Sequence, residues 1–180
     1  MKRDETRIER YSKRISSARY LPVEICTVNF CFEENLGFLV RAAACFGVSK
    51  INVIGSVPLE KDLKRYSGSL NRFVKIQQFI NPREYLSYAE KTKYPIISAE
   101  ISNSSRPISS IDFNSFGNFH LVVGNESTGI PAEIRMQSTE IFIPMQGVGY
   151  CLNTSQTANI FLYEISSQLE KTNQKNLYCA

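Results

Sequence analysis

The chain has 180 residues, of which 43% are hydrophobic and 21% are charged, values close to those of ordinary globular proteins. This length supports one sizeable core and argues against two ordinary domains. Because no apolar run reaches the roughly 18 residues that span a bilayer, and the first residues are too polar for a secretion signal, we expect neither a membrane protein nor a secreted one.

Cysteine and histidine usage bears on metals and on the cellular compartment. The five cysteines form no C-x-x-C pair, and His120 is the only histidine. Structural zinc sites need such pairs or clusters, so the sequence predicts no metal site. An odd number of cysteines is typical of reduced thiols, and we therefore expect a cytoplasmic protein.

The net charge of +4 is concentrated at the N-terminus. Residues 1–20 contain seven Lys and Arg against three Asp and Glu, whereas the rest of the chain contains fourteen of each sign. We therefore divide the chain into a basic extension, residues 1–21, and one domain, residues 22–180.

A helix is predicted over residues 3–18 of this extension. At 100° per residue, four arginines share one stripe within an arc of about 60°: Arg3, Arg7, Arg10 and Arg14. An apolar stripe beside it, which includes Tyr11 and Ile15, can dock on the body or on a partner. The arginine stripe faces either an anion or solvent, because a charged helix face alone is weak grounds for a ligand.

Beyond Pro22, strand and helix patterns alternate. Strands are predicted at 23–30, 50–54, 72–79, 95–100, 119–123 and 139–143. Helices are predicted at 36–46, 58–66, 82–92, 131–137 and 154–170, and residues 102–118 are predicted to be a surface connection. This alternation predicts an α/β fold, with a mainly parallel sheet and helices on both of its faces.

The first segment that contains candidate functional residues begins at Asn35. Arg41 is the only charged residue between Asn35 and Ser49. We expect so apolar a helix to be buried, and a buried guanidinium needs an anionic partner. That partner is either a structural carboxylate such as Glu34, or a phosphate, which the planar fork of arginine suits. Gly37, in the first turn, predicts close approach of another backbone or a ligand.

The second segment is residues 121–131, LVVGNESTGIP. An apolar strand runs into a polar turn between two glycines and then into a helix, a place where open α/β sheets bind ligands. The glycine spacing is that of a phosphate-binding loop, but Ile130 and Pro131 stand where Lys and Ser or Thr are required. On its own, the segment is a strand-to-helix turn that carries an acidic residue, Glu126.

The third segment is residues 143–155, IPMQGVGYCLNTS. Pro144 ends a strand, and a loop with two glycines leads to the last helix. Asn153 is a good N-cap for that helix, with Gln156 three residues further on as in a capping box. For this segment alone, a helix cap is the simpler interpretation of Asn153.

Taken together and in this order, the three segments resemble the SpoU/TrmH family of RNA ribose methyltransferases, in the SPOUT superfamily. The first family motif is matched by Asn35, Gly37 and Arg41, and the second, G-N-E-x-x-G-[IL]-P, by residues 124–131. The third, I-P-M followed by a loop and S-[ILM]-N-x-S, is matched by residues 143–145 and 151–155. The resemblance covers roughly residues 22–170.

The resemblance implies a fold, a cofactor and partners. Members of the family form a C-terminal trefoil knot, bind S-adenosylmethionine in the knot loops, and work as homodimers on structured RNA. The expected reaction is methylation of a ribose 2′-hydroxyl in transfer or ribosomal RNA, which needs no metal. By position, the cofactor-binding residues would be Ala99, Gly124, Ile143, Met145, Cys151 and Leu152. The N-terminal helix lies outside the resemblance, and we expect from its charge that its arginine stripe binds the RNA.

The resemblance also assigns catalytic roles. Arg41 would lie close to the target ribose and its phosphate, near the cofactor of the other subunit. A guanidinium stays protonated at ordinary pH, so we favour electrostatic stabilisation over the role of general base. Asn35 would hold the substrate, Glu126 would position Arg41 or the loop, and Asn153 would hydrogen-bond near the reacting hydroxyl.

Cys151 departs from the family pattern, which usually has Ser at this position, and a thiol is a weak hydrogen-bond donor. The departure leaves open a different class of protein, an RNA-binding protein of the same fold with weak or no catalysis. A SPOUT enzyme that methylates a base nitrogen is a further alternative. It is disfavoured because the second and third segments match ribose methyltransferases.

Overall fold

The computed structural model describes residues 6–29 and 32–178, without the side chains of Arg7, Ile8, Arg10 and residues 172–178. The helices are α1 (Arg7–Ile15), α2 (Glu33–Phe46), α3 (Glu60–Ser67), α4 (Pro82–Thr92), α5 (Ala132–Arg135) and α6 (Thr154–Tyr178). The strands are β1 (Val23–Val28), β2 (Lys50–Ile54), β3 (Lys75–Phe79), β4 (Ile96–Ala99), β5 (Arg106–Pro107), β6 (Phe119–Val123) and β7 (Ser138–Phe142). Short 3-10 turns occur at Asn71–Phe73, Ile108–Ser110 and Phe113–Phe116.

The seven strands form one sheet in the order β3-β2-β1-β6-β4-β7-β5, and every pairing in it is parallel. The chain builds outward from β1 to β3 and then returns to the opposite side of β1. In open α/β sheets, the carboxyl ends of the strands next to such a reversal form the ligand-binding crevice. The fold class predicted from the alternating pattern is confirmed.

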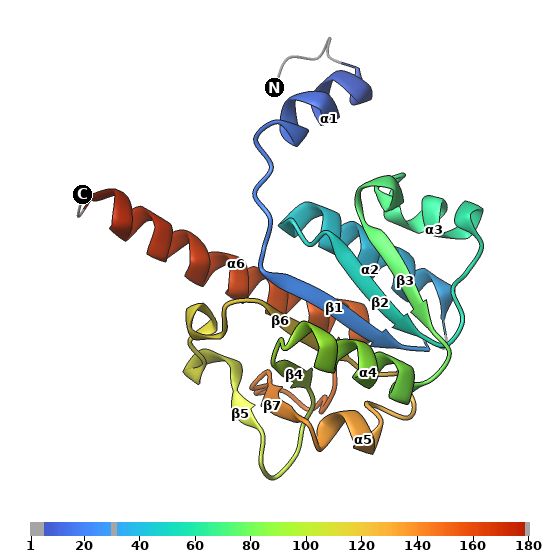
Figure 1. Cartoon of the computed structure of the whole chain (residues 1–180), viewed down its shortest axis with the longest axis vertical. Coiled ribbons are helices and arrows are strands. Elements are labelled where there is room, and N and C mark those ends of the chain that lie inside the picture. Colours follow the sequence, from blue (N-terminus) through green and yellow to red (C-terminus); the bar gives the residue numbers. More distant parts are fainter. Residues whose placement is uncertain (1–5, 30–31, 179–180) are drawn as a thin grey trace.

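Helices cover both faces of the sheet, as predicted (Figure 1). Figure 1 shows α2, α3 and α6 on one face, and α4 and α5 on the other. Successive strand residues point to opposite faces. Ile25 and Leu121 therefore pack in the core beneath α2 and α6, whereas Cys26 and Val122 pack in a second core with Tyr85 of α4. These two cores hold the strand ends, and the loops that follow them, in fixed positions.

Three predicted elements have the observed bounds: the strands 50–54 and 119–123 and the helix 82–92. The predicted strand 72–79 begins only at Lys75, because residues 71–73 form a 3-10 turn.

The prediction of a simple surface connection over 102–118 is wrong. The segment includes β5, and Phe113 is buried with its ring stacked 5.9 Å from that of Phe119. Its backbone N–H donates to Gln168 of α6 at 2.9 Å, so this connection packs as part of the core.

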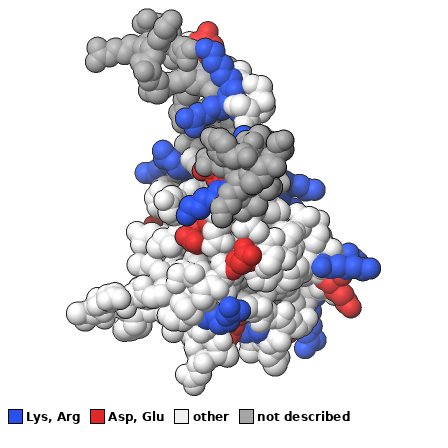
Figure 2. Space-filling view, turned by 90° about the vertical axis from the view of Figure 1, so that its left-hand side faces the viewer, with Lys and Arg blue, Asp and Glu red and all other residues white. Residues whose placement is uncertain are grey.

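The N-terminal helix is shorter than predicted in the described part of the chain. It begins after Thr6, whose side chain and that of Glu9 form a reciprocal capping box. Arg3 lies outside the described residues, and Arg14 is exposed. Figure 1 shows α1 standing off the sheet at the end of an extended segment, and Figure 2 shows basic side chains on it. The ring of Tyr11 contacts that of Phe73 at 5.7 Å, so the apolar stripe does reach the body.

Candidate active site

The candidate site lies at the carboxyl edge of the sheet, where the loops after β4, β6 and β7 meet the first turns of α2 and α6. The loop after β6 is a closed turn, in which Asn125 and Gly129 exchange two backbone hydrogen bonds of 3.0 Å. The side-chain oxygen of Asn125 accepts the backbone N–H groups of Ser127 and Thr128 at 2.8 and 3.1 Å. Gly124 is required here, because a Cβ at this position would lie 2.6 Å from the carbonyl carbon of Gly129.

Side chains from the three sequence segments meet in one hydrogen-bonded chain. Asn35, buried in the first turn of α2, donates through its Nδ2 to a carboxylate oxygen of Glu126. The Oδ1 of Asn35 accepts the Nδ2–H of Asn153 at 3.0 Å. Asn153 in turn accepts the backbone N–H of Ser155 at 2.9 Å, so it also caps α6 as the sequence suggested. We refer to Glu126, Asn35 and Asn153 as the amide relay.

Arg41 does not lie where the sequence suggested. The expectation of a buried guanidinium is wrong, because Arg41 is exposed, and no ion pair joins it to Glu34 in the described part of the chain. α2 buries one face, which includes Leu39 and Val40, and turns Arg41 to the other, where Phe38 is 44% exposed. Arg41 therefore contributes no hydrogen bond to the amide relay and is free to meet a group outside this subunit.

For Gly37, the sequence predicted close approach of either another backbone or a ligand, and the structure shows which of the two occurs. A Cβ there would lie 2.4 Å from the Cβ of Tyr66, so the close approach is to a neighbouring helix, α3, and not to a ligand. The ring of Tyr66 then meets that of Phe38 edge-on at 5.7 Å. This packing fixes the N-terminal half of α2 and with it Asn35.

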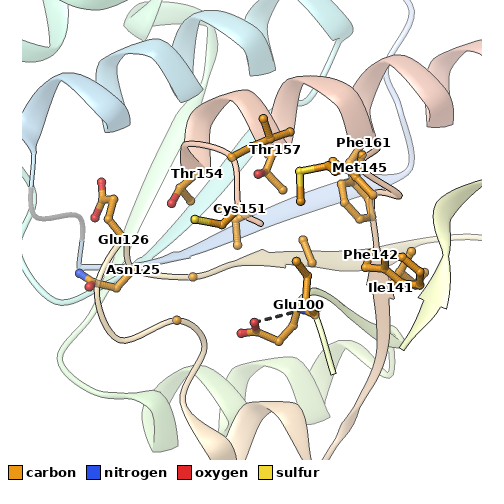
Figure 3. A pocket seen from close by; sticks show the side chains of 17 residues that line it. Glu100, Asn125, Glu126, Ile141, Phe142, Met145, Cys151, Thr154, Thr157 and Phe161 are labelled. Atoms are coloured by element: carbon orange, nitrogen blue, oxygen red, sulfur yellow. Dashed lines mark hydrogen bonds between the residues drawn. The ribbon is translucent and has the colours of Figure 1, made fainter. Parts of the chain in front are cut away.

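A cavity of about 210 Å³ lies beside the amide relay. It is lined by 17 residues, many of which Figure 3 shows. All six cofactor-binding candidates line it: Ala99, Gly124, Ile143, Met145, Cys151 and Leu152. Segments far apart in the sequence therefore form one concave surface, from three strand ends and the first turns of α6.

Several lining residues were missed at the sequence level. Glu100 follows directly after β4, and Thr154, Thr157 and Phe161 come from the inner face of α6. Glu100 was open to prediction, because it is the last residue of the predicted strand 95–100, at the ligand-binding edge of a parallel sheet. The α6 residues were not, because the strong apolar periodicity of that helix indicated only core packing.

The cavity is acidic. Its ionisable lining residues are Glu100, Glu126 and the thiol of Cys151, and none of the described lining residues is Lys, Arg or His. Such a surface suits a cationic ligand better than an anionic one. Within residues 6–29 and 32–178, no group of three or more His, Cys, Asp or Glu side chains is placed to hold a metal ion. In the same residues, no helix is long and apolar enough to cross a membrane.

Comparison with known proteins gives the class of this chain. A profile of the SpoU rRNA Methylase family matches residues 22–163, and the chain belongs to that family. It is 28% identical over 139 residues to the 23S rRNA (guanosine-2′-O-)-methyltransferase RlmB of Acinetobacter baylyi, an alignment that covers 75% of this chain and 55% of that protein. The chain thus spans about half the length of this relative.

Solved structures of proteins from the same family share the fold of this chain. The TrmH/SpoU tRNA modifying enzyme of A. aeolicus superposes with a TM-score of 0.79 at 25% identity, over 92% of this chain and 86% of that one. An AdoMet-bound rRNA methyltransferase from Sinorhizobium meliloti superposes with a TM-score of 0.75 at 21% identity, over 82% of this chain and 56% of that one. The α/β fold of this chain is therefore that of SpoU/TrmH proteins.

Proposed function

We propose that the protein transfers a methyl group from S-adenosylmethionine to a ribose 2′-hydroxyl of transfer or ribosomal RNA. The observation that carries this proposal is the amide relay at the rim of the acidic cavity. Its central residue, Asn35, links Glu126 in the cavity lining to Asn153 at the exposed rim, through groups that the three family motifs supply. The names of the family and of the relatives, which include a ribose 2′-O-methyltransferase, support the same reaction.

The cavity fits S-adenosylmethionine by its chemistry. Two carboxylates suit a sulfonium cation, and the absence of a side chain at Gly124 leaves turn backbone uncovered at the cavity wall. We assign cofactor contacts to the six candidate residues: Ala99, Gly124, Ile143, Met145, Cys151 and Leu152. When bound, the cofactor supplies an electrophilic methyl group, and the protein's task is to orient the attacking hydroxyl beside it.

Arg41 acts in this proposal through its charge. A guanidinium stays protonated, so it binds the phosphate next to the target ribose and stabilises the alkoxide that develops as the hydroxyl loses its proton. Asn35 is held by hydrogen bonds on both sides of its amide, so its orientation is fixed before RNA binds. Asn153 is exposed at the rim, where it can meet the reacting hydroxyl, and Glu126 holds the relay in place.

We further propose a homodimer in which Arg41 of one subunit faces the cavity of the other. Large apolar side chains stand exposed on the two helices that flank the site: Phe38 on α2, and Ile160 and Tyr163 on α6, with exposures of 44%, 39% and 64%. Tyr150, in the loop before α6, is 84% exposed. In this proposal the partner subunit covers these side chains, as apolar groups at an interface are covered.

The remaining parts of the proposal rest on the charge of the N-terminal segment and on the family. Residues 1–21 would be an RNA-binding extension, with Arg3, Arg7, Arg10 and Arg14 as phosphate contacts. Residues 22–180 would form the methyltransferase domain, closed by a C-terminal trefoil knot. A tRNA or rRNA substrate would place the protein in the cytoplasm.

The decisive experiment is methyl transfer in vitro. The purified protein would be incubated with S-adenosylmethionine carrying a labelled methyl group and with total tRNA or rRNA. Modified positions would then be mapped by their resistance to alkaline cleavage, which requires a free 2′-hydroxyl. Label at one cleavage-resistant position is expected. RNA binding without label would instead favour the non-catalytic alternative, to which the Cys151 departure points, and label on a base would overturn ribose specificity.

A further inference from the structure

Glu100 is a carboxylate in the cavity wall that no sequence motif contains, and it has no role of its own in the proposed function beyond the general fit of the cavity to a cation. It follows β4 directly, and its backbone N–H donates to the carbonyl of Ile141 at 3.0 Å, which fixes the start of its side chain against β7. Figure 3 shows its carboxylate on the wall opposite Cys151 and Thr157. The residue is half-buried, so its charge is only partly screened by solvent.

The position of this carboxylate is set by the turn after β6. Its Oε2 accepts the backbone N–H of Ile130 at 3.3 Å, and its Oε1 accepts that of Ile101 at 3.2 Å. A Cβ on Gly129 would lie 3.1 Å from Oε2, so a glycine at this position leaves the carboxylate room against the turn. Glu100 is thereby held in the cavity wall.

The charge of Glu100 remains available for a ligand. Its two hydrogen bonds are long and come from neutral donors, whereas an ionised carboxylate has about four acceptor sites. The charge of Glu100 helps to raise the pKa of Arg135, but the main cause of that rise is the hydrogen bond from Arg135 to Glu140. Glu100 makes the smallest contribution. The other carboxylate of the cavity, Glu126, accepts a hydrogen bond from Asn35.

We propose that Glu100 makes the cofactor site selective for charge: it favours S-adenosylmethionine over the product S-adenosylhomocysteine. This inference rests on the proposed function. Transfer breaks the bond between sulfur and the methyl carbon, leaves the electron pair on sulfur, and joins the methyl group to the ribose oxygen, whose proton passes to water. The sulfonium becomes a neutral thioether, while the rest of the molecule is unchanged. Glu100 therefore attracts S-adenosylmethionine, and this attraction is lost when the reaction has produced S-adenosylhomocysteine.

The test compares ligands that differ in this one charge. Dissociation constants would be measured by calorimetry for S-adenosylmethionine, for S-adenosylhomocysteine, and for sinefungin, in which a carbon bearing an amino group replaces the sulfonium. Glu100→Gln should weaken binding of the two cations about tenfold, as expected for loss of one nearby charge in a half-exposed site. Binding of the neutral product should change less than about twofold.

Two controls separate a charge effect from a loosened loop. Glu100→Ala should change the ratio of the first two affinities in the same way, because general damage to the cavity weakens both ligands equally. Glu90→Gln, which removes an exposed carboxylate on α4 outside the cavity, should leave all three constants unchanged. An unaltered ratio in both Glu100 variants would overturn the inference. Failure of the wild-type protein to bind any of the three ligands would instead overturn the proposed function.

Discussion

The side chain of Asn153 donates a 3.0 Å hydrogen bond to that of Asn35, a residue 118 positions earlier in the chain. Asn35 is only 4% exposed and has Glu126 on its other side. A buried amide with both ends paired is oriented without ambiguity, and removal of either partner leaves a polar group unsatisfied. The relay therefore contributes to the stability of the fold as well as to the geometry of the site.

A double-mutant cycle should reveal this coupling. Asn35→Ala is expected to cost about 1–3 kcal/mol of unfolding free energy, because it removes one hydrogen bond to the carboxylate of Glu126 and another to the amide of Asn153. Asn153→Ala should cost about 1 kcal/mol, and the double variant should fall short of the sum by roughly 0.5–1 kcal/mol. Urea unfolding would measure all three. A cycle of Asn35 with Asn103, an exposed loop residue, is the control and should be additive.

Replacement of Arg41 should reduce activity while leaving the stability of the fold nearly unchanged. Because its side chain is exposed and forms no ion pair with any described residue, Arg41→Ala should alter the unfolding free energy by less than about 0.5 kcal/mol. Single-turnover methyl transfer should fall by roughly 100-fold or more, as expected on losing a group that stabilises developing charge. Affinity for S-adenosylmethionine should change little. Full activity in a folded Arg41→Ala variant would contradict the catalytic assignment.

Gly124 tests whether the turn after β6 shapes the cavity. Alanine there places a Cβ 2.6 Å from the backbone of Gly129, so the turn must shift. Weaker binding of S-adenosylmethionine is expected, together with a loss in transfer rate of roughly 10- to 100-fold. Gly147→Ala is the matched control, because a Cβ there meets nothing within 4 Å. Equal behaviour of the two variants would mean that the turn does not position the cofactor.

Much of this architecture was predictable because the patterns are local. The parallel sheet follows from alternating strand and helix segments, and helix 82–92 follows from its N-cap, Asn81, and from Pro82 in its first turn. The packing of residues 102–118 was not predictable, because a Ser- and Asn-rich sequence gives no local sign that Phe113 finds a partner in Phe119. Such contacts depend on how distant segments meet.

The candidate site also combines features that local sequence predicts with contacts that depend on distant segments. Asn35, Glu126 and Asn153 could be named from the motifs, but their mutual hydrogen bonds depend on three loops that only the folded sheet brings together. The error over Arg41 came from judging burial by the composition of the helix. Seven residues of α2 are indeed buried, but the helix has a second face, and Arg41 lies on it. Glu100 was overlooked because no motif contains it.

The N-terminal extension gives a prediction about RNA. Deletion of residues 1–20 removes all of the net charge of +4. If four arginines engage phosphates, the slope of log affinity against log salt should become shallower by roughly three to four units. Filter binding over a range of salt concentrations would measure this, with S-adenosylmethionine binding as the check on folding. Arg14→Ala, at an exposed position and one of the four arginines, should give about a quarter of the effect without truncation. An unchanged slope would identify α1 as a solvated helix.

The last prediction concerns His120, which lies fully buried in β6, away from the cavity. Its Nε2 lies 2.9 Å from the hydroxyl of Thr92, and its ring lies among those of Tyr85, Tyr88 and Tyr94. Burial lowers the pKa of His120 to about 4, although the charge of Glu24 acts to raise it. The folded protein therefore holds the imidazole neutral at a pH where the unfolded chain, with a pKa near 6.5, binds a proton.

Because the folded pKa is the lower one, the stability contributed by His120 is complete above about pH 6.5 and is lost as the pH falls toward 4. Between pH 7.5 and pH 5 the wild-type protein should lose on the order of 2 kcal/mol of unfolding free energy. His120 is the only histidine, so no other histidine contributes in this window. In His120→Gln, which can still hydrogen-bond Thr92, the unfolding free energy should depend less steeply on pH, even if the variant is less stable at every pH. Urea unfolding at several pH values would measure both slopes, and parallel slopes would show that another group governs the loss.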